Sequence, residues 1–431
     1  MSRETMSRET MTSAQHEQDL MACVHCGLCL PACPTYLETG SEADSPRGRL
    51  VLMRKMHEGT LSASDAVHHL DLCLGCRACE TACPSGVPYG CILETARERI
   101  NAEHVRSRQT DRARSALLGT LAQPKKMTIA MRMAQAVTGG GVPAPAVRLL
   151  SGVRTAEAQT TSLPAHISPP LPDAVTPAVG PKRARVGVLA GCAMRVLFGD
   201  VNSDTVRVLA ANGCEVLVNR RQGCCGALHG HSGYGDEARS LARALIDAFT
   251  PLDGLDAIVV NSAGCGSQMK EYGHLFAGDP VYAEKAAAFA AKVRDASEWL
   301  DALGWVAPLR SVSAAPVTMA YHDACHLAHG QGVRDAPRAL LARLPNTIWV
   351  TLPESEVCCG SAGIYNFTEP DMARRLQARK LEHILSTGAS VIAAGNPGCL
   401  AWIASGLRER GLPDIRVAHP VTLLADALAA R

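Results

Sequence analysis

The sequence predicts a multidomain α+β protein in which a helical, cysteine-rich N-terminal domain precedes two repeated α/β halves. The chain of 431 residues is too long for one compact hydrophobic core. One four-cysteine phrase, Cys-x2-Cys-x2-Cys-x3-Cys-Pro, occurs twice near the N-terminus. In the C-terminal part, an order of strands and helices around a Cys-Cys-Gly sequence is also written twice. These three observations together predict the fold class.

Composition and charge exclude several classes of protein. The 43 basic and 41 acidic side chains give a formal charge of +2, and no nucleic-acid-binding motif is present, so we expect no nucleic-acid partner. The 18 cysteines lie in spaced clusters, and the polar start has no signal-peptide pattern. In a reducing cytoplasm this pattern favours metal binding over disulfides. No apolar run reaches the length of about 18 residues at which a membrane span is predicted.

The N-terminal part of the chain divides into three predicted segments. Residues 1–20 are polar and begin with a duplicated MSRETMSRET, so we expect a disordered tail. Residues 21–101 hold both four-cysteine phrases, with a helix expected from Pro46 between them. Residues 102–182 form a helical connector, which is broken by prolines and a glycine run and then becomes a Pro/Ala-rich linker. We therefore expect residues 21–101 to form a separate domain.

The rest of the chain is predicted as two copies of one α/β unit, residues 183–310 and 311–431. In each copy a short apolar strand ends at a cysteine, a helix and a second strand lead to Cys-Cys-Gly, and a long helix precedes a last strand and a last cysteine. The corresponding cysteines are almost equally spaced. They are Cys192, Cys224, Cys225 and Cys265 in the first copy, and Cys325, Cys358, Cys359 and Cys399 in the second.

The doubled four-cysteine phrase predicts two 4Fe–4S clusters of the ferredoxin type, in a dicluster domain. Three cysteines of each phrase bind one cluster, and the cysteine before proline reaches across to the other cluster. The expected ligands are Cys23, Cys26, Cys29 and Cys83 for the first cluster, and Cys73, Cys76, Cys79 and Cys33 for the second. Two zinc knuckles are the alternative, but they prefer paired Cys-x2-Cys hairpins. Such clusters pass single electrons, and His25 and Arg77 within the loops are either tuning groups or solvated side chains.

The two Cys-Cys-Gly sets predict a further pair of metal or cluster sites. If the strands are parallel, their carboxyl ends share one sheet edge, which brings the cysteines of a set together. Gly226 and Gly360 are expected to permit the turn that aims both thiols of each pair inward. The alternatives are buried structural thiols or one structural zinc ion in each copy. The sequence does not distinguish a cluster from zinc.

Other cysteines and histidines receive weaker predictions. Cys91 and Cys214 fit neither pattern and are expected in the core. The histidines His322, His326 and His329 surround Cys325 and are either ligands, proton carriers or ordinary hydrogen-bonding residues. No G-x-G-x-x-G follows a strand and no Walker motif is present, so we expect no flavin, nicotinamide or ATP site and no catalytic residue for organic substrates.

The stretches CVHCGLCLPACPTY, SPRGR, CLGCRACETACPSGVPYG and VCCGSAG, in this order, resemble the iron–sulfur subunits of bacterial glycolate oxidase (glycolate dehydrogenase). The resemblance covers nearly the whole chain from about residue 20. It implies a multi-subunit oxidoreductase in which flavin-binding partners oxidise glycolate to glyoxylate. This subunit, inactive alone, then passes the electrons towards a quinone or other respiratory acceptor.

Related subunits offer alternatives to this function. They are the equivalent subunit of a lactate or anaerobic glycerol-3-phosphate dehydrogenase, and a thiol-disulfide reductase similar to heterodisulfide reductase. The last family typically ends its repeats in Cys-x2-Cys, whereas this chain has single cysteines, Cys265 and Cys399, at those places. This departure argues against disulfide chemistry.

We expect a cytoplasmic protein, and the segment 113–150 raises the further hypothesis of attachment to the inner face of the cytoplasmic membrane. The segment mixes apolar stripes with basic positions at Arg114, Lys125, Lys126 and Arg132. Packing of the apolar stripe on the Cys-Cys-Gly halves is the simpler interpretation. Binding to anionic lipid, close to a quinone, is the other.

Overall fold

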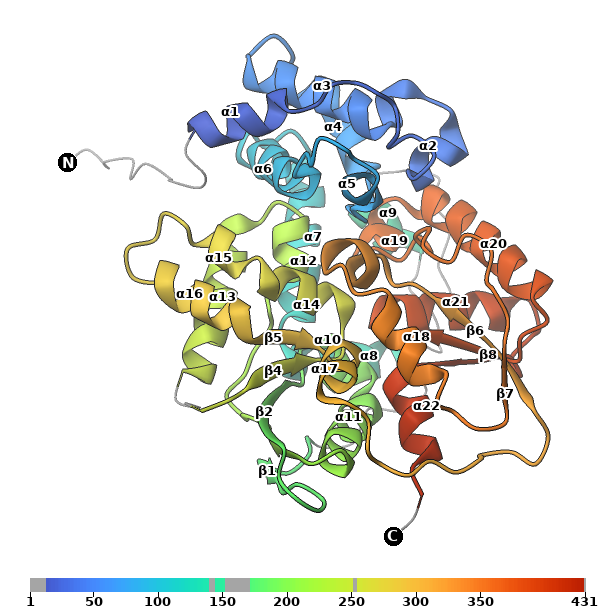
Figure 1. Cartoon of the computed structure of the whole chain (residues 1–431). Coiled ribbons are helices and arrows are strands. Elements are labelled where there is room, and N and C mark those ends of the chain that lie inside the picture. The colour runs from blue at the N-terminus through green and yellow to red at the C-terminus, as the bar shows by residue number, and fades with distance from the viewer. Residues whose placement is uncertain (1–12, 139–143, 152–170, 251–253, 430–431) are drawn as a thin grey trace.

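The protein is described from a computed structural model, in which residues 13–138, 144–151, 171–250 and 254–429 are placed well enough to describe. The helical N-terminal domain lies across one end of two α/β halves, which stand side by side (Figure 1). This arrangement confirms the predicted fold class. No helix in the described ranges is both long and apolar enough to cross a bilayer.

The N-terminal domain consists of short helices joined by the two cysteine loops. Its elements are α1 (Ser13–Met21), α2 (Pro34–Thr39), the 3-10 turn η1 (Glu42–Asp44), α3 (Pro46–His57), α4 (Ala63–Asp71), α5 (Ala78–Thr81) and α6 (Tyr89–Ala102). Helix α3 begins at the predicted Pro46, where Ser45 Oγ accepts a hydrogen bond of 3.0 Å from the Gly48 backbone N–H. Apolar residues of α3, α4 and α6, such as Met53, Leu70 and Ile92, form the core of this domain.

The prediction of a disordered tail over residues 1–20 is wrong for its last part. Residues 1–12 lie outside the described residues, but α1 already begins at Ser13. Leu20 on this helix is only 3% exposed and packs into the core of the N-terminal domain. Leu20 therefore anchors a helix that is otherwise mostly polar.

The connector continues as helices and packs on the first half. It comprises α7 (Arg108–Leu121), α8 (Pro124–Thr138) and α9 (Ala144–Ser151), and most of the predicted Pro/Ala-rich linker lies outside the described residues. Met127 and Met131 of α8 pack against Val196. Arg114, one of the basic positions noted in the segment 113–150, is buried and donates a 3.2 Å hydrogen bond to Asp71, so it does not belong to a basic surface.

The first half is a sheet flanked by helices, in the strand order β1-β3-β2-β4-β5. Its strands are β1 (Val175–Thr176), β2 (Ala184–Leu189), β3 (Cys214–Leu217), β4 (Ala257–Val260) and β5 (Val293–Asp295). Its helices are α10 (Ala193–Leu197), α11 (Gly199–Ala211), α12 (Ala227–His231), α13 (Gly235–Phe249), α14 (Ala263–Lys270), α15 (Tyr272–Leu275), α16 (Ala283–Lys292) and α17 (Ala296–Leu303). All strand pairs are parallel except that of β1 with β3.

The second half repeats this sheet without the antiparallel edge strand, in the order β7-β6-β8-β9. Its strands are β6 (Val317–His322), β7 (Thr347–Trp349), β8 (Val391–Ala394) and β9 (Arg416–Ala418). Its helices are the π-helical turn η2 (His326–Gly330), α18 (Asp335–Leu341), α19 (Tyr365–Thr368), α20 (Pro370–Ser386), α21 (Pro397–Glu409) and α22 (Pro420–Ala427). All three strand pairs are parallel.

The two halves share one apolar core. Helix α11 of the first half packs on α22 of the second, so that Val206 and Leu209 belong to the same buried cluster as Leu424. Parallel strands bring their carboxyl ends to a common edge in each half. Because the halves pack together, their two cysteine-bearing edges come close to each other and to the N-terminal domain.

Candidate functional site

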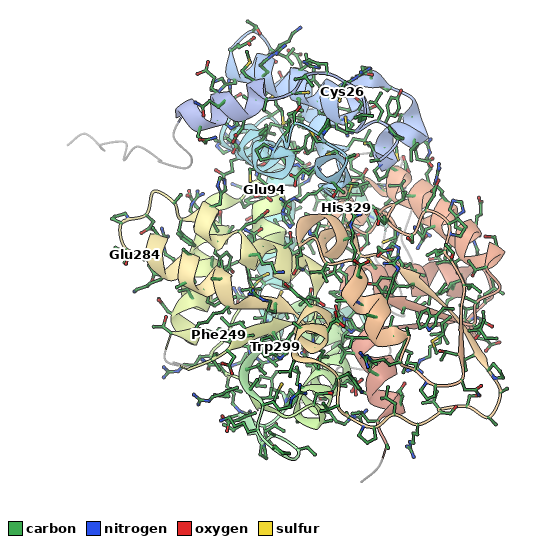
Figure 2. The ribbon with its side chains drawn as sticks, in the orientation of Figure 1. Cys26, Glu94, Phe249, Glu284, Trp299 and His329 are labelled. Carbon is green, nitrogen blue, oxygen red and sulfur yellow. The ribbon has the colours of Figure 1, made fainter. Side chains whose placement is uncertain are left out.

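The cysteines of the first phrase gather around a small cavity in the N-terminal domain. The cavity is lined by Cys23, Cys26 and Cys29 of the first loop, and by Cys79 and Cys83 from the second phrase. Cys83 is thus placed with the first loop, although it is far from that loop in sequence. Cys26 is exposed and lies near the outer surface of the domain (Figure 2).

A second cavity lies deeper in the same domain. The cysteines that line it are Cys73, Cys76 and Cys79 of the second loop, together with Cys33 of the first phrase. Cys33, Cys73 and Cys76 are buried. The structure therefore brings together both predicted four-cysteine sets, and Cys79 lines both cavities.

Buried polar groups surround the thiols of the second cavity. The guanidinium of Arg49, which is 1% exposed, donates to Thr35 Oγ1 at 3.0 Å and approaches Cys33 Sγ at 3.9 Å. The Tyr89 hydroxyl and the Gly75 backbone N–H donate to Cys73 Sγ at 3.5 and 3.4 Å. Burial opposes ionisation of Cys73, but the nearby charges of Arg49 and Arg97 and these hydrogen bonds lower its pKa. This environment suits a thiolate, the form that binds iron.

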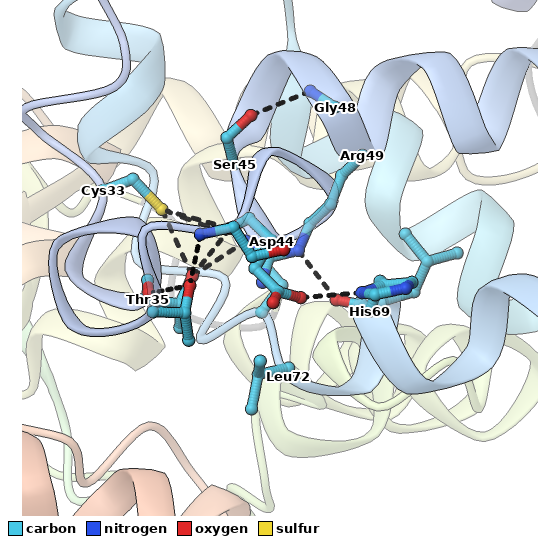
Figure 3. A network of polar contacts seen from close by, with 12 residues as sticks. Cys33, Thr35, Asp44, Ser45, Gly48, Arg49, His69 and Leu72 are labelled. Atoms are coloured by element: carbon cyan, nitrogen blue, oxygen red, sulfur yellow. Dashed lines mark hydrogen bonds and ion pairs between the residues drawn. The ribbon is translucent and has the colours of Figure 1, made fainter.

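A polar network holds Arg49 in this position (Figure 3). Its Nε donates to the His69 carbonyl oxygen at 2.7 Å, and Asp44 lies 3.8 Å from its Nη2. Asp44 Oδ1 also contacts His69 Nδ1 at 2.8 Å. From the sequence, Arg49 was recognised only as part of the stretch SPRGR, and its position beside the cysteines was not predicted.

The four cysteines of the first Cys-Cys-Gly set are in contact with one another. Cys192 Sγ lies 3.5 Å from Cys224 Sγ, and Cys225 contacts both Cys224 and Cys265. The contact with Cys192 is the main cause that holds the pKa of Cys224 well below its ordinary value. Gly226 follows with a φ of +84°, and a Cβ there would lie 2.8 Å from the Ala238 carbonyl oxygen. The predicted need for glycine is confirmed here.

The second Cys-Cys-Gly set is built in the same way. Cys358 contacts Cys325 and Cys359, and Cys359 in turn contacts Cys399. Gly360 has a φ of +91°, and a Cβ there would lie 2.6 Å from the Ala373 carbonyl oxygen. In both sets the first cysteine lies in the short loop after a parallel strand, near the predicted strand end. The last cysteine was predicted to end a strand, but Cys265 and Cys399 instead lie in the first turn of the following helices, α14 and α21.

Both Cys-Cys-Gly sets open on one cavity of about 300 Å³ between the halves. All eight of their cysteines line it, and Cys73 of the second loop lines it as well. Burial, and then the neighbouring Cys325 thiol, raise the pKa of Cys76 well above its ordinary value. The second loop therefore adjoins the Cys-Cys-Gly cavity, which the sequence did not predict.

Hydrogen bonds fix this junction from both halves. The Tyr365 hydroxyl donates to the Leu72 carbonyl oxygen at 2.9 Å, and His326 Nε2–H donates to that of Gly75 at 2.9 Å. Arg77 forms ion pairs with Glu80 at 2.8 Å and with Glu271, which lies between α14 and α15. Burial, and then repulsion by His231, lower the pKa of His326 to about 3, so it acts as a neutral donor.

The remaining candidates lie away from the cysteine sets or at their margin. Cys214 is buried on β3, as predicted, whereas Cys91 on α6 is only half-buried. His329 Nδ1 contacts Thr81 Oγ1 at 3.0 Å, at the boundary between the N-terminal domain and the second half (Figure 2). The His25 side chain is exposed, and its carbonyl oxygen accepts a hydrogen bond from Arg47.

Comparison with known proteins places these features in families. The family model "4Fe-4S dicluster domain" matches residues 19–87, and "Cysteine-rich domain" matches residues 186–270 and 319–404. A probable glycolate oxidase iron-sulfur subunit of Bacillus subtilis (strain 168) is 36% identical over 423 residues, which cover 95% of this chain and 94% of that one.

Two further relatives show how the similarity is distributed. The glycolate oxidase iron-sulfur subunit of Escherichia coli (strain K12) is 34% identical over 430 residues, covering 98% of this chain and 97% of that one. Lactate utilization protein A of Oceanobacillus iheyensis is 34% identical over 241 residues, covering 56% of this chain and 96% of that one. Similarity over nearly the full chain is thus found with the two glycolate oxidase subunits.

Proposed function

The chain belongs to the family of glycolate oxidase iron-sulfur subunits, and from this premise we propose that it carries electrons from glycolate oxidation through two 4Fe–4S clusters. The observation that carries this proposal is the pair of adjoining cavities, each lined by three cysteines of one loop and the distant cysteine of the other. Iron–sulfur clusters supply one-electron transfer. Flavin-binding partner subunits oxidise glycolate to glyoxylate in this proposal, and the chain alone is inactive.

The residues of both cavities fit thiolate-bound clusters. Cys23, Cys26, Cys29 and Cys83 hold the first cluster, and Cys73, Cys76, Cys79 and Cys33 hold the second. The buried guanidinium of Arg49 offsets thiolate charge, and the Tyr89 hydroxyl and Gly75 N–H orient the Cys73 sulfur. Lactate is the less favoured substrate of the partner subunits, because the lactate utilization relative cited above covers only 56% of the chain.

The exchange of ligands between the phrases gives a direct test. Cys33→Ser should remove the electron paramagnetic resonance signal of the second cluster, although Cys33 lies in the first phrase. Cys83→Ser should remove that of the first cluster. Each variant should lose the iron of one cluster, about four atoms per chain. Cys91→Ser, outside both cavities, is the matched control and should keep both signals.

One result would contradict the proposed exchange of ligands between the phrases. Loss of the first cluster in Cys33→Ser, and of the second in Cys83→Ser, would show that each phrase binds its own cluster. Glycolate should reduce both signals of the unchanged protein, but only when the flavin subunits are added. Reduction by glycolate without those subunits would overturn the assignment of an electron-transfer role.

We propose that each Cys-Cys-Gly set binds a metal centre, either a further cluster or zinc. Four thiols in mutual contact within a buried set are a typical ligand arrangement for a soft or borderline metal ion. The sets lie where electrons leave the second cluster, because Cys76 adjoins Cys325 and Cys73 lines the shared cavity. Metal counting on the purified complex tests this proposal.

A surface on α8 supports peripheral attachment of the complex to the cytoplasmic face of the membrane, where a quinone accepts the electrons. Ile129 and Met133 are 60% and 63% exposed, and Lys125, Lys126 and Arg132 are exposed on the same helix. Basic residues near an anionic surface contribute about 1 kcal/mol each to binding. Replacing all three by Gln should therefore weaken binding of the intact complex to phosphatidylserine vesicles by about a hundredfold. Unchanged vesicle binding would leave α8 with only its packing role.

A further inference from the structure

His322 in the second half is a buried histidine whose burial its hydrogen bonds do not explain. The side chain is 0% exposed, and among the described residues its ring nitrogens have no full hydrogen bond and lie only beside the Cys359 thiol. A buried polar group without a partner is costly, so such a histidine indicates a missing ligand. The ring stands at the carboxyl end of β6, against the second Cys-Cys-Gly set.

The surroundings of His322 have the donor set of a metal site. One ring nitrogen of His322 and the sulfur atoms of Cys359 and Cys399 all lie within 4.8 Å of one another. Around a tetrahedral zinc ion, bond lengths of about 2.3 Å to sulfur and about 2.0 Å to nitrogen separate neighbouring ligand atoms by about 3.7 Å. Small side-chain adjustments would therefore close the three groups around one ion.

We propose that His322, Cys359 and Cys399 are three ligands of a single zinc ion, whose fourth position faces Cys358 and Cys325. This inference extends the proposed metal binding of the second Cys-Cys-Gly set and adds a ligand that is not a cysteine. Mixed histidine and thiolate ligands at tetrahedral spacing are characteristic of zinc.

The first half lacks this arrangement at corresponding positions. Leu189 ends β2 three residues before Cys192, just as His322 ends β6 three residues before Cys325. Leu189 pairs with Val260 on the next strand, and His322 pairs with Ala394, so the two positions match in register. A leucine in the first half thus occupies the place of the histidine in the second.

A second difference between the halves concerns charge. Lys380 on α20 is 2% exposed and donates to the Glu354 carbonyl oxygen, close to Cys359. Gly360 faces Ala373 on α20, and Gly226 faces Ala238 on α13. The residue that follows Ala238 at the same distance as Lys380 follows Ala373 is Leu245. With Cys358 as a third thiolate, a zinc site carries one net negative charge. Lys380 balances that charge inside the protein, which the leucine of the first half would not do.

The first half does contain one buried histidine near its cysteines, His229. Within the described part of the chain, however, only His322, Cys359 and Cys399 meet the spacing of a common metal ion. His229 is therefore the matched control for His322, since both are buried imidazoles next to a Cys-Cys-Gly set.

The test is zinc and iron counting by mass spectrometry on the full chain, purified anaerobically with its partner subunits. The unchanged protein should hold one zinc ion per chain in the second half. His322→Leu, which copies the residue of the first half, should reduce this zinc at least tenfold and leave the iron content unchanged. His229→Leu should keep the zinc. Absence of zinc from the unchanged protein, or full zinc in His322→Leu, would overturn the inference.

Two further measurements keep the test decisive if His322→Leu does not fold. His322→Cys supplies another zinc ligand and should retain the zinc. After exchange of zinc for cobalt, the thiolate-to-cobalt absorption of His322→Cys should be stronger than that of the unchanged protein, and an identical spectrum would exclude His322 as a ligand. Glycolate-driven cluster reduction is recorded on the same samples. If glycolate fails to reduce the clusters but the zinc measurements come out as expected, only the electron-transfer proposal is contradicted. If glycolate reduces the clusters but the zinc measurements do not come out as expected, only this inference is contradicted.

Discussion

The two cysteine loops of the N-terminal domain have nearly the same backbone but different glycine positions. In the first loop His25 and Gly27 have positive φ angles of 54° and 84°. In the second loop the corresponding residues, Gly75 and Arg77, have φ angles of 64° and 66°. Each loop thus requires two left-handed residues, and each uses glycine at only one of them. The other position holds the exposed His25 in the first loop and, in the second, Arg77, which pairs with Glu80 and Glu271.

The surroundings of the two loops differ much more than their backbones. Val24 and Leu28 of the first loop are 68% and 57% exposed, on either side of the exposed Cys26. In the second loop, Leu74 and Cys76 are buried in the same apolar cluster as residues of the second half. One duplicated phrase has therefore produced one cysteine-lined cavity near the surface and another in the interior. This asymmetry fits electrons that enter at the first loop and leave past the second.

The largest expected effect is on the order in which the two clusters are lost. When the protein is treated with ferricyanide and a chelator, the signal of the first cluster should disappear about ten times faster than that of the second, or faster still. The reagents can reach the second cluster only after the buried structure around it opens locally. The measurement is electron paramagnetic resonance of samples reduced after increasing exposure times. Cys33→Ser, which lacks the second cluster in our proposal, serves to assign the remaining signal. Equal rates for both clusters would mean that the difference in burial has no consequence for access.

The fold could be predicted largely because its signals are local. Apolar strands followed by cysteines, and glycines after each cysteine pair, predicted both α/β halves and placed their thiols at strand ends. The common cavity could not be predicted, because it depends on the packing of α11 on α22. The contact of His326 with Gly75 likewise joins residues 251 positions apart. The buried role of Arg114 was missed because a basic residue on an amphipathic helix is ordinarily exposed.

The second expected effect, on the free energy of unfolding, concerns the arginine that forms ion pairs at each loop. Arg77 is 14% exposed and pairs with Glu80 and Glu271, so Arg77→Met would leave two partly buried carboxylates without a cation. We expect a loss of about 2–4 kcal/mol in the free energy of unfolding. Arg47, which donates to the His25 carbonyl oxygen in the first loop, pairs with Glu42 at the surface. Arg47→Met should have little effect on stability, because surface ion pairs contribute little.

Anaerobic urea unfolding, followed by tryptophan fluorescence, measures both arginine variants. The double variant Arg77→Met/Glu271→Gln should recover part of the stability that Arg77→Met loses, because it removes one of the stranded charges. Similar losses from Arg47→Met and Arg77→Met would show that the two loops are braced equally, and would contradict the contrast in burial.

The smallest effect is expected behind the second loop, where Glu369 at the start of α20 faces Asp71 at the end of α4. Burial, and then repulsion by Asp71, raise the pKa of Glu369 from 4.5 to about 7. The unfolded chain therefore releases this proton at lower pH than the folded chain, and folding loses stability as the pH rises from about 4.5 to 7. Glu369→Gln cannot ionise and avoids this loss. The variant should gain about 2 kcal/mol over the unchanged protein between pH 5 and pH 8.

Urea unfolding of both proteins at pH 5 and pH 8 measures this gain, and Glu382→Gln is the control because Glu382 is exposed on the same helix. The sign of the effect is its most informative property. A carboxylate that pairs favourably with Arg114 and Arg106 would make Glu369→Gln less stable at pH 8, since those arginines would lose a partner. Greater stability at pH 8 would instead show that Arg114 and Arg106 do not need Glu369, since Asp71 already lies 3.2 and 2.5 Å from them. The interior behind the second loop would then hold one carboxylate more than its arginines use.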